Sequence, residues 1–284
     1  MYITNMLVGH DKPRGLGVVV VSSDSVDYEK ALAVVKRQVV PTMNKLSLEA
    51  QKLLSLVLAQ VNPKQMILKD MRFRIRIEDY QTLAGIKSPK VAWRHMQLAC
   101  KELSETRLDI EPDDVLPLIN RKEDGVGLLR KHRPSHRNIG LVDYADYYPY
   151  LKEIELMFTR SFEPYVVQVT KVTPYHRDKV LTTLKISSDT TMRLYRKLSE
   201  FASNKRKEHW WRVSIDEFKV VMGLSSDSYS DYRNLRRRVI EPALKLLNEH
   251  SEYDMITVDT DTKGRKVVGL YFKYKRREQL KLDI

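Results

Sequence analysis

A segment repeated at a constant offset is the feature of this sequence that most restricts its fold. Residues 74–85 (RIRIEDYQTLAG) match residues 212–223 (RVSIDEFKVVMG), so Ile77 and Gly85 recur as Ile215 and Gly223 at the same offset. Each copy has the pattern of a half-buried strand followed by a short helix closed by glycine. Such a repeat predicts two related domains rather than one large core.

The elements around the two copies also follow one order. Upstream of each copy an amphipathic helix is predicted. The first is expected to begin at Ser47, which caps it, and the second at Asp189, where either Asp189 or Thr190 is the cap. Downstream of each copy, a basic helix is predicted and then a strand. In the first copy the helix covers 90–104 and the strand 107–110, and in the second copy the helix covers 228–250 and the strand 254–258. This order is that of a winged helix-turn-helix. The sequence therefore predicts an α+β fold of two tandem winged helix-turn-helix domains related by internal duplication.

Domain boundaries follow from this order. Residues 1–27 mix Gly, Pro, Ser and Asp without helical periodicity and are expected to form a flexible N-terminal arm. Residues 28–170 are predicted to form the first winged-helix domain and residues 171–284 the second. Within the first, residues 28–37 fit either a short helix or a strand.

The helix predicted over 228–250 has an apolar face and a cationic face. The apolar face gathers Leu235, Val239, Ala243, Leu246 and Leu247 at about 100° per residue. The cationic face gathers Ser230, Arg233, Asn234 and Arg237, flanked by Arg236 and Arg238. In a DNA major groove Arg pairs with guanine and Asn with adenine. This face is therefore predicted to bind DNA, although an arginine run alone also fits a solvated surface helix.

Pro242 lies inside this helix. A proline there removes a backbone hydrogen bond to Arg238 and costs about 3 kcal/mol, so a kink is expected. We expect the segment before Pro242 to contact DNA and the segment after it to pack in the core.

The basic helix of the first copy is predicted to make a second groove or backbone contact. One of its faces carries Lys90, Arg94, Gln97 and Lys101, and the opposite face is expected to bury Val91, Leu98, Ala99 and Leu103. Trp93 and Cys100 flank the basic face, where they fit either core packing or a partner surface.

A wing is predicted at the end of the second copy, where strands over 253–259 and 266–275 flank a turn at Gly264. Lys263 and Arg265 at its tip are expected on phosphates or in the minor groove. An exposed turn kept soluble by lysine fits equally well. In the first copy the basic segment 121–137 interrupts the equivalent region, and it either lies on the DNA backbone or stays solvated.

Composition favours a polyanion as partner. The 50 Lys and Arg residues exceed the 37 Asp and Glu residues, which gives a net charge of +13. The single Cys100 excludes an intramolecular disulfide and fits a reducing cytoplasm. No apolar run approaches the roughly 20 residues that a membrane helix needs. We therefore expect a cytoplasmic protein that does not contact membranes.

Motifs for catalysis are missing from the sequence. It has no G-x-x-x-x-G-K-[ST] phosphate loop. His132 and His136 are too far apart for the metal ligands of a rolling-circle nickase, and the acidic pair Asp113 and Asp114 lacks further ligands at metal-site spacing. We therefore expect no enzyme activity, no metal and no cofactor, and binding as the function.

Three stretches resemble the iteron-binding plasmid replication initiator family (RepA/RepE type). They are NKLSLEAQKLLSLVLAQV at 44–61, SSDTTMRLYRKLSEF at 187–201 and RRRVIEPALKLLNEHSEYD at 236–254. The middle stretch, with Ser188 and Arg193-Leu194-Tyr195, is the most specific. The basic insertion after Asn120 is longer than the family's wing, and the arm 1–27 has no counterpart in the family pattern, which leaves the dimer geometry open.

The resemblance implies two winged-helix domains and a function. Monomers of such initiators bind direct repeats at a plasmid origin and recruit the host initiator and helicase, while dimers repress their own promoter. It also implies that residues 229–238 read the major groove and that the first domain contacts DNA and forms the dimer.

We interpret the chain as a sequence-specific, origin-binding initiator. Arg233, Asn234 and Arg237 are expected on bases, and Arg236, Arg238, Lys263 and Arg265 on phosphates. The alternatives are a tandem winged-helix transcriptional regulator without a role in replication, and a non-catalytic assembly protein whose basic surface meets an acidic partner.

Overall fold

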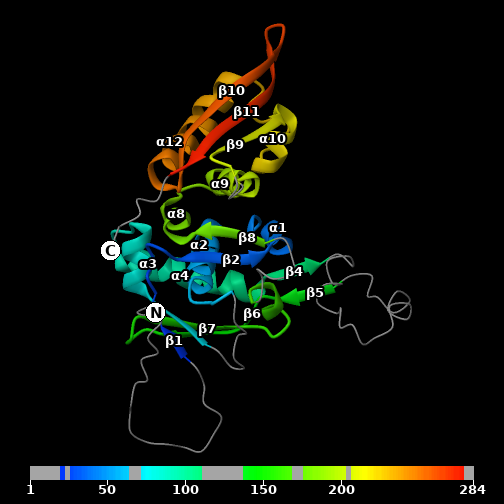
Figure 1. Ribbon diagram of the computed structural model, residues 1–284. Helices are drawn as coiled ribbons and strands as arrows, with labels where there is room; N and C mark the ends of the chain where they lie inside the picture. The colour runs from blue at the N-terminus through cyan, green and yellow to red at the C-terminus, as the bar shows by residue number, and fades with distance from the viewer. Residues whose placement is uncertain are drawn as a thin grey trace, which may run out of the picture.

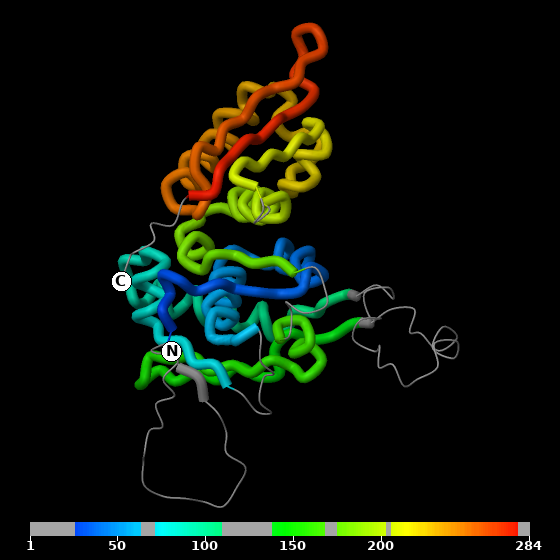
Figure 2. Tube along the Cα trace, viewed as in Figure 1, coloured from blue at the N-terminus to red at the C-terminus, as the bar shows by residue number. Residues whose placement is uncertain are grey.

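Two hydrophobic cores, one in each half of the chain, organise the protein. Figures 1 and 2 show these two halves stacked one above the other. The computed structural model describes residues 20–22, 26–63, 72–110, 137–167, 175–202 and 206–277. The first core uses residues from Ala33 to Leu184, and the second uses residues from Ile186 to Tyr274. This division confirms the α+β duplication that the repeat predicts.

The first domain surrounds a central helix, α2 (Leu48–Leu58), in which most side chains are buried. Its N-cap is Ser47, as predicted, because the Ser47 hydroxyl oxygen accepts a 3.3 Å hydrogen bond from the backbone N–H of Ala50. Two further helices, α3 (Ile77–Ala84) and α4 (Pro89–Glu105), complete the helical layer. A four-stranded sheet lies on the other side, in the order β1 (Val20–Ser22), β3 (Arg72–Arg76), β7 (Glu153–Phe158) and β6 (Val142–Tyr148).

The N-terminal part of the chain adds strands to this domain. β1 pairs in parallel with β3, so three residues of the predicted arm 1–27 are part of the sheet. Residues 28–37, which fitted a helix or a strand, form β2 (Leu32–Lys36), followed by η2 (Arg37–Val39) and α1 (Val40–Met43).

β2 pairs with a strand from the far end of the domain. Its antiparallel partner is β8 (Tyr175–Lys179), which leads into α8 (Val180–Lys185). Val180 and Leu184 of α8 belong to the first core. The predicted boundary after residue 170 is therefore misplaced, because β8 and α8 complete the first domain. A pairing between residues so far apart leaves no signal in local periodicity.

The second domain is smaller and contains helices and one sheet. Its elements are α9 (Asp189–Phe201), β9 (Glu208–Ser214), α10 (Ile215–Met222), α11 (Tyr232–Leu235), η4 (Arg236–Ile240), α12 (Glu241–His250), β10 (Tyr253–Lys263) and β11 (Lys266–Arg276). The antiparallel sheet has the order β10, β11, β9, and Trp211 stacks on Phe272 beneath it at 5.2 Å between ring centroids. α9 is capped by Ser188, which accepts from the N–H of Thr191 at 3.2 Å, and not by Asp189 or Thr190 as predicted.

The two domains share one order of elements around the repeated segment. β3, α3 and α4 correspond to β9, α10 and the helix from α11 to α12, and Gly85 and Gly223 both end their helices in the left-handed conformation (φ 69° and 71°). Only glycine adopts this conformation without steric cost, which explains the repeated residue.

The wing of the first domain differs from the prediction. In the first domain β7 pairs with β3 and with β6, and in the second domain β11 pairs with β9 and with β10. The hairpin β6–β7 is therefore the counterpart of β10–β11, and β6 is the counterpart of β10. Residues 107–110 form β4 (Arg107–Ile110), which pairs with β5 (Arg137–Gly140) in a separate two-stranded sheet. The predicted equivalence of 107–110 with 254–258 is therefore wrong. Most of the basic insertion 121–137, and the arm up to residue 19, lie outside the described residues.

Candidate nucleic-acid interface

The helix that carries the arginine run begins later than predicted. Residues 226–229 form a turn, and the first helical residue is Tyr232 of α11 rather than Ser228. The carboxylate of Asp231 caps it by accepting a 2.9 Å hydrogen bond from the backbone N–H of Arg233. Ser230 is exposed in the turn just before this cap.

A π-helical turn, η4, connects α11 to α12. The backbone N–H of Glu241 bonds to the carbonyl oxygen of Arg236, five residues earlier. Pro242 follows at the start of α12, and Ile240 and Glu241 keep right-handed helical angles. The wider turn therefore lies where we predicted a kink, and the helix continues through a residue that cannot donate a backbone hydrogen bond.

Burial in this helix divides by face rather than by segment. Arg233, Arg236, Arg237 and Arg238 are exposed and Asn234 is half-buried. Leu235, Val239 and Ile240 are buried in the second core, as are Ala243 and Leu247 beyond the proline. The segment after Pro242 packs in the core as expected, the predicted apolar face before it is also buried, and the predicted cationic face is at the surface.

Among the residues that the structure describes, one of these arginines forms an ion pair. The guanidinium of Arg236 lies 2.9 Å from a carboxylate oxygen of Glu241. Within the ranges that the structure describes, Arg233, Arg237 and Arg238 form no ion pair with a carboxylate. A guanidinium without a carboxylate partner can form bidentate hydrogen bonds to a phosphate or a guanine.

The wing tip of the second domain concentrates positive charge at the far end of the molecule (Figure 1). Gly264 (φ 63°) and Arg265 form its turn, and Lys263 lies directly opposite Lys266 in the hairpin. All three basic side chains are exposed. Like charges opposite each other repel, so an anion close to the tip would stabilise it. The sequence analysis missed Lys266, which the register of a two-residue turn would have identified.

The exposed face of α4 carries the predicted polar residues. Lys90, Arg94, Gln97 and Lys101 are all exposed. Val91 and Leu98 are also exposed, by 43% and 54%, although we expected them to be buried. The residues that α4 buries are Ala92, Met96, Ala99, Cys100 and Leu103. The helix is therefore rotated relative to the prediction, and the stripe that it buries combines small residues with Met96 and Leu103.

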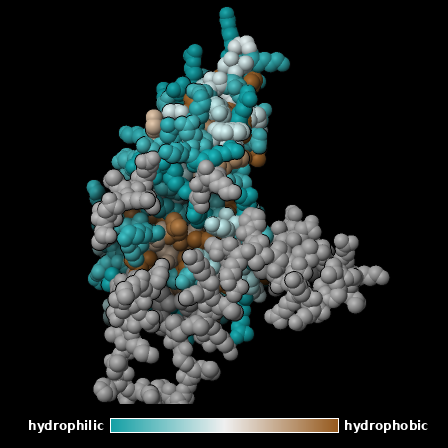
Figure 3. All heavy atoms as spheres, viewed as in Figure 1, coloured by the Kyte–Doolittle hydropathy of each residue, from teal (hydrophilic) through white to brown (hydrophobic). Residues whose placement is uncertain are grey.

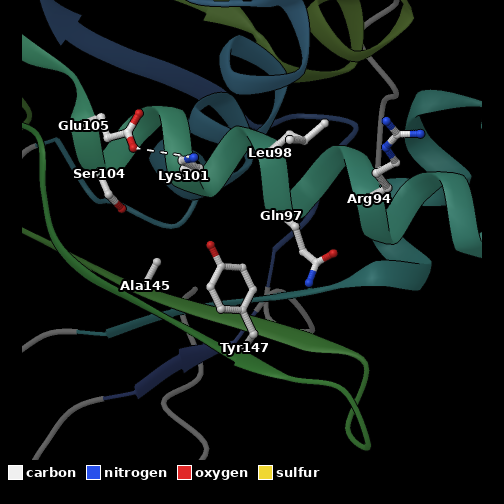
Figure 4. Close-up of a pocket in the computed structure, with 8 residues that line it drawn as sticks. All are labelled: Arg94, Gln97, Leu98, Lys101, Ser104, Glu105, Ala145 and Tyr147. Atoms are coloured by element: carbon white, nitrogen blue, oxygen red, sulfur yellow. Dashed lines mark ion pairs between the residues drawn. The ribbon is translucent and has the colours of Figure 1, made fainter.

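Arg94, Gln97 and Lys101 line a groove between α4 and β6 (Figure 4). Leu98, Ala145 and Tyr147 form its apolar surface, and the ring of Tyr147 points toward α4. Lys101 lies 4.0 Å from the Glu105 carboxylate. The first domain therefore offers a mixed polar and apolar surface, unlike the arginine face of the second.

Trp93 and Cys100 pack in the core rather than forming a separate surface. Cys100 is buried, and burial raises the pKa of its thiol to about 12. Trp93 is half-buried against the first core. Within the described ranges, no three His, Cys, Asp or Glu side chains come together as a metal site would need.

On the face shown in Figure 3, hydrophilic residues cover most of the second domain, and hydrophobic residues gather at the level of β2. None of the helices that the structure describes has the length and apolar character to span a membrane.

Comparisons with known proteins agree with this architecture. A family model described as "Initiator Replication protein, WH1" matches residues 33–199, and one described as "Initiator Rep protein, WH2" matches residues 214–274. The chain is 26% identical to the "PI protein" of Escherichia coli over 243 residues, which cover 82% of this chain and 79% of that protein. It is also 26% identical to a "Replication initiation protein" of Escherichia coli over 151 residues, 52% of this chain and 46% of the relative.

A solved structure shares the fold of both domains. The crystal structure of the Pi initiator protein in complex with iteron DNA matches with a TM-score of 0.73 and 23% identity, over 88% of this chain and 99% of that one. The first family model alone spans more than half of the sequence. The chain is therefore a member of the initiator replication (Rep) protein family, with the two winged-helix domains that define it.

Proposed function

We propose that this protein initiates plasmid replication by binding double-stranded DNA at directly repeated sequences, or iterons, in the origin. The observation that carries the proposal is a cluster of exposed arginines on the last helix of a winged helix-turn-helix. Arg233, Arg237 and Arg238 of this cluster form no ion pair with any carboxylate in the described part of the chain. The Pi initiator, which shares the fold, was crystallised with iteron DNA, and this supports repeats as the target.

The residues divide by role. Arg233, Asn234 and Arg237 contact base edges in the major groove, where Arg and Asn recognise guanine and adenine. Arg236, Arg238, Lys263 and Arg265 contact phosphates, and Ser230 lies beside them at the helix start. Lys90, Arg94, Gln97 and Lys101 make the second groove or backbone contact through the first domain.

Binding, rather than catalysis, is the activity that these residues support. The first domain also forms the dimer, and the dimer represses the promoter of its own gene. The bound monomer recruits the host initiator and helicase, which supply the enzymatic steps, in the cytoplasm where the plasmid resides. A tandem winged-helix transcriptional regulator is the alternative, and membership of a replication initiator family argues against it.

A plasmid-maintenance assay tests the proposal. The DNA fragment that lies next to the gene is cloned as the only origin of a test plasmid, and the gene is supplied in trans. We expect cells to retain this plasmid. Loss of the plasmid together with repression of the adjacent promoter would favour the regulator. Gel shifts with origin DNA of increasing repeat number are expected to give one additional band per repeat. Binding that ignores sequence at moderate salt would favour an assembly protein that meets acidic partners.

A further inference from the structure

Two arginines of α9 cross from the second domain to the first. α9 belongs to the second core through Met192, Leu194 and Leu198. The guanidinium of Arg193 donates a 2.8 Å hydrogen bond to the backbone carbonyl oxygen of Asn44, which follows α1. The guanidinium of Arg196 donates a 2.7 Å hydrogen bond to the side-chain oxygen of the same asparagine. Both oxygens of Asn44 are thus held by arginines one helical turn apart.

Arg196 is also held by two other elements of the first domain. Only 2% of the residue is exposed. Its guanidinium donates to the side-chain oxygen of Gln51 on α2 at 2.6 Å and to the carboxylate of Asp178 on β8 at 3.0 Å. The second carboxylate oxygen of Asp178 lies 2.6 Å from the ring of His176. One buried guanidinium therefore has acceptors from three separate segments of the first domain.

Such a joint favours the orientation in which all three acceptors reach Arg196. A buried guanidinium is costly unless its hydrogen bonds are made with good geometry, because the charge has lost its water. The planar fork of arginine fixes direction as well as distance. Rotating one domain against the other would separate Arg196 from Asn44, Gln51 and Asp178 together, and leave buried charges unpaired.

The residues of this joint also lie next to the segments that hold the two candidate DNA-binding helices, α4 and α11. In the second domain, a Cβ atom placed on Gly223 would lie 1.8 Å from the guanidinium of Arg193, so this side chain lies against the end of α10, where the turn toward α11 begins. In the first domain, the backbone N–H of Ser47, three residues after Asn44, donates a 2.7 Å hydrogen bond to Glu102 of α4.

We propose that Asn44, Arg193 and Arg196, named here the Asn44 clamp, hold α4 and α11 at a fixed separation. The protein then recognises the distance between two contacts on a duplex as well as the bases at each contact. Arg193 and Arg196 are positioning residues, which act on DNA only through the domains they join. The inference rests on the proposed function, because it requires both helices to contact one DNA molecule.

Binding to DNA of altered spacing tests the clamp. The probe is the duplex that the full-length wild-type chain enriches from a random pool, with variants that gain or lose one or two base pairs between its two protected segments. Each added base pair rotates one contact by about 35° around the helix axis and shifts it along the groove. Wild type is expected to lose about tenfold in affinity per base pair changed, which corresponds to ~1.4 kcal/mol.

Variants Arg193→Met and Arg196→Met are expected to bind DNA of the original spacing about tenfold more weakly than wild type does. Each variant is expected to bind DNA of altered spacing nearly as well as it binds DNA of the original spacing. Lys197→Met on the same helix is the matched control, because Lys197 pairs with Glu200 rather than with the first domain. It should keep the wild-type spacing preference. Arg193 and Arg196 variants that weakened every spacing equally, or kept the preference, would overturn the proposal.

A distance measurement without DNA separates the clamp from the proposed function. Spin labels are attached to cysteines introduced at Glu78 and Asp216, equivalent exposed positions in the two repeats, while buried Cys100 stays unlabelled. Wild type and Lys197→Met are expected to give one narrow distance distribution, and Arg196→Met a broad one. Asn44→Ala leaves Arg196 paired with Asp178 and is expected to broaden the distance distribution less than Arg196→Met does. It replaces Arg196→Met in this experiment if that variant does not fold.

The outcomes of the two experiments are distinguishable. A narrow distribution in both Arg196→Met and Asn44→Ala would refute the clamp whatever the DNA results. A wild-type chain that enriched no duplex from the pool would instead refute the proposed function, with the distance measurement still deciding whether the clamp orients the domains.

Discussion

The ammonium group of Lys219 donates a 2.8 Å hydrogen bond to the carbonyl oxygen of Ser226, and so ties α10 to the turn that precedes α11. Lys219 is only 6% exposed, although it belongs to a surface helix. A buried hydrogen bond from a charged donor contributes about 1.5 to 3 kcal/mol. A buried lysine of α10 therefore anchors the turn from which the arginine-bearing helix begins.

We expect Lys219→Met to lower the free energy of unfolding by about 1 to 2 kcal/mol, because the aliphatic stem remains and the hydrogen bond is lost. Specific DNA affinity should fall with it, since the turn before α11 loses its anchor. Denaturant unfolding and gel shifts measure the two effects. Lys245→Met, at an exposed position of α12, is the control and should change neither. Unchanged stability of Lys219→Met would show that this hydrogen bond contributes nothing.

Arg237 and Lys263 should respond differently to substitution by alanine. Arg237→Ala is expected to cost about 1 to 3 kcal/mol on the cognate repeat and to relax specificity at one base pair. Lys263→Ala should weaken binding to all sequences alike and reduce the slope of log K against log salt by about 1. Titrations at several salt concentrations with cognate and scrambled DNA distinguish these effects. Equal losses on both DNAs for Arg237→Ala would contradict a base contact.

Gly85 and Gly223 offer a matched pair for the joint between the domains. Alanine at either position incurs the cost of the left-handed conformation, about 1 to 2 kcal/mol. A Cβ atom at Gly85 meets nothing within 4 Å, whereas at Gly223 it meets the guanidinium of Arg193. Gly223→Ala should therefore lower the free energy of unfolding more than Gly85→Ala does. The expected difference is about the contribution of one hydrogen bond, because the guanidinium of Arg193 has to move. Thermal unfolding of both variants tests this, and equal losses would contradict it.

Asp178 should make stability depend on acid pH. Burial alone raises the pKa of a carboxyl, but His176 and Arg196 more than offset this and lower the pKa of Asp178 to about 2. A lowered pKa means that the folded state binds fewer protons than the unfolded one. The stabilisation is thus complete above the unfolded pKa near 3.8 and is lost as the pH falls toward 2.

Asp178→Asn removes this titration and leaves Arg196 without its counter-charge. Its loss of stability relative to wild type should be large at neutral pH, about 3 to 5 kcal/mol for a broken buried pair, and should shrink at low pH. Urea unfolding across the acid range measures the difference. A gap between wild type and variant that stayed constant with pH would exclude Asp178 as the titrating group.

Cys100 should be unreactive in the folded protein. The thiolate is the reactive form, and burial raises the pKa of this thiol to about 12. We expect Ellman's reagent to modify no thiol at mildly alkaline pH until denaturant is added, and then to modify one. Rapid modification of the native chain would show that α4 opens from the first core.

The sequence predicted the local elements well because they depend on local chemistry. The repeat located β3, α3, β9 and α10, and buried positions alternate in β3 and β9 as the half-buried strand pattern predicts. Ser47 as N-cap and the cationic face from Arg233 to Arg238 follow from residue type and spacing alone. These features need no information from distant parts of the chain.

The cap of α9 was a choice between neighbouring residues, whereas the larger errors arose because tertiary contacts decided between locally equivalent choices. The exposure of Leu98 depends on which stripe of α4 meets α2. The π turn before Pro242 lies between Leu235 and Ile240, which are both buried in the second core. Arg193 and Arg196 were noticed only as part of a family-like stretch, because their partners lie in the other domain.

The pairing of β2 with β8 also determines when the first domain can fold during synthesis. β2 leaves the ribosome early, whereas its partner strand follows only after residue 175 has been translated. Until then Val34 and Val35 lie on an unpaired edge, which is the kind of surface that promotes aggregation. A nascent chain or a truncated fragment that stops at residue 170 carries this open edge, so soluble expression of the first domain alone requires an end point beyond α8.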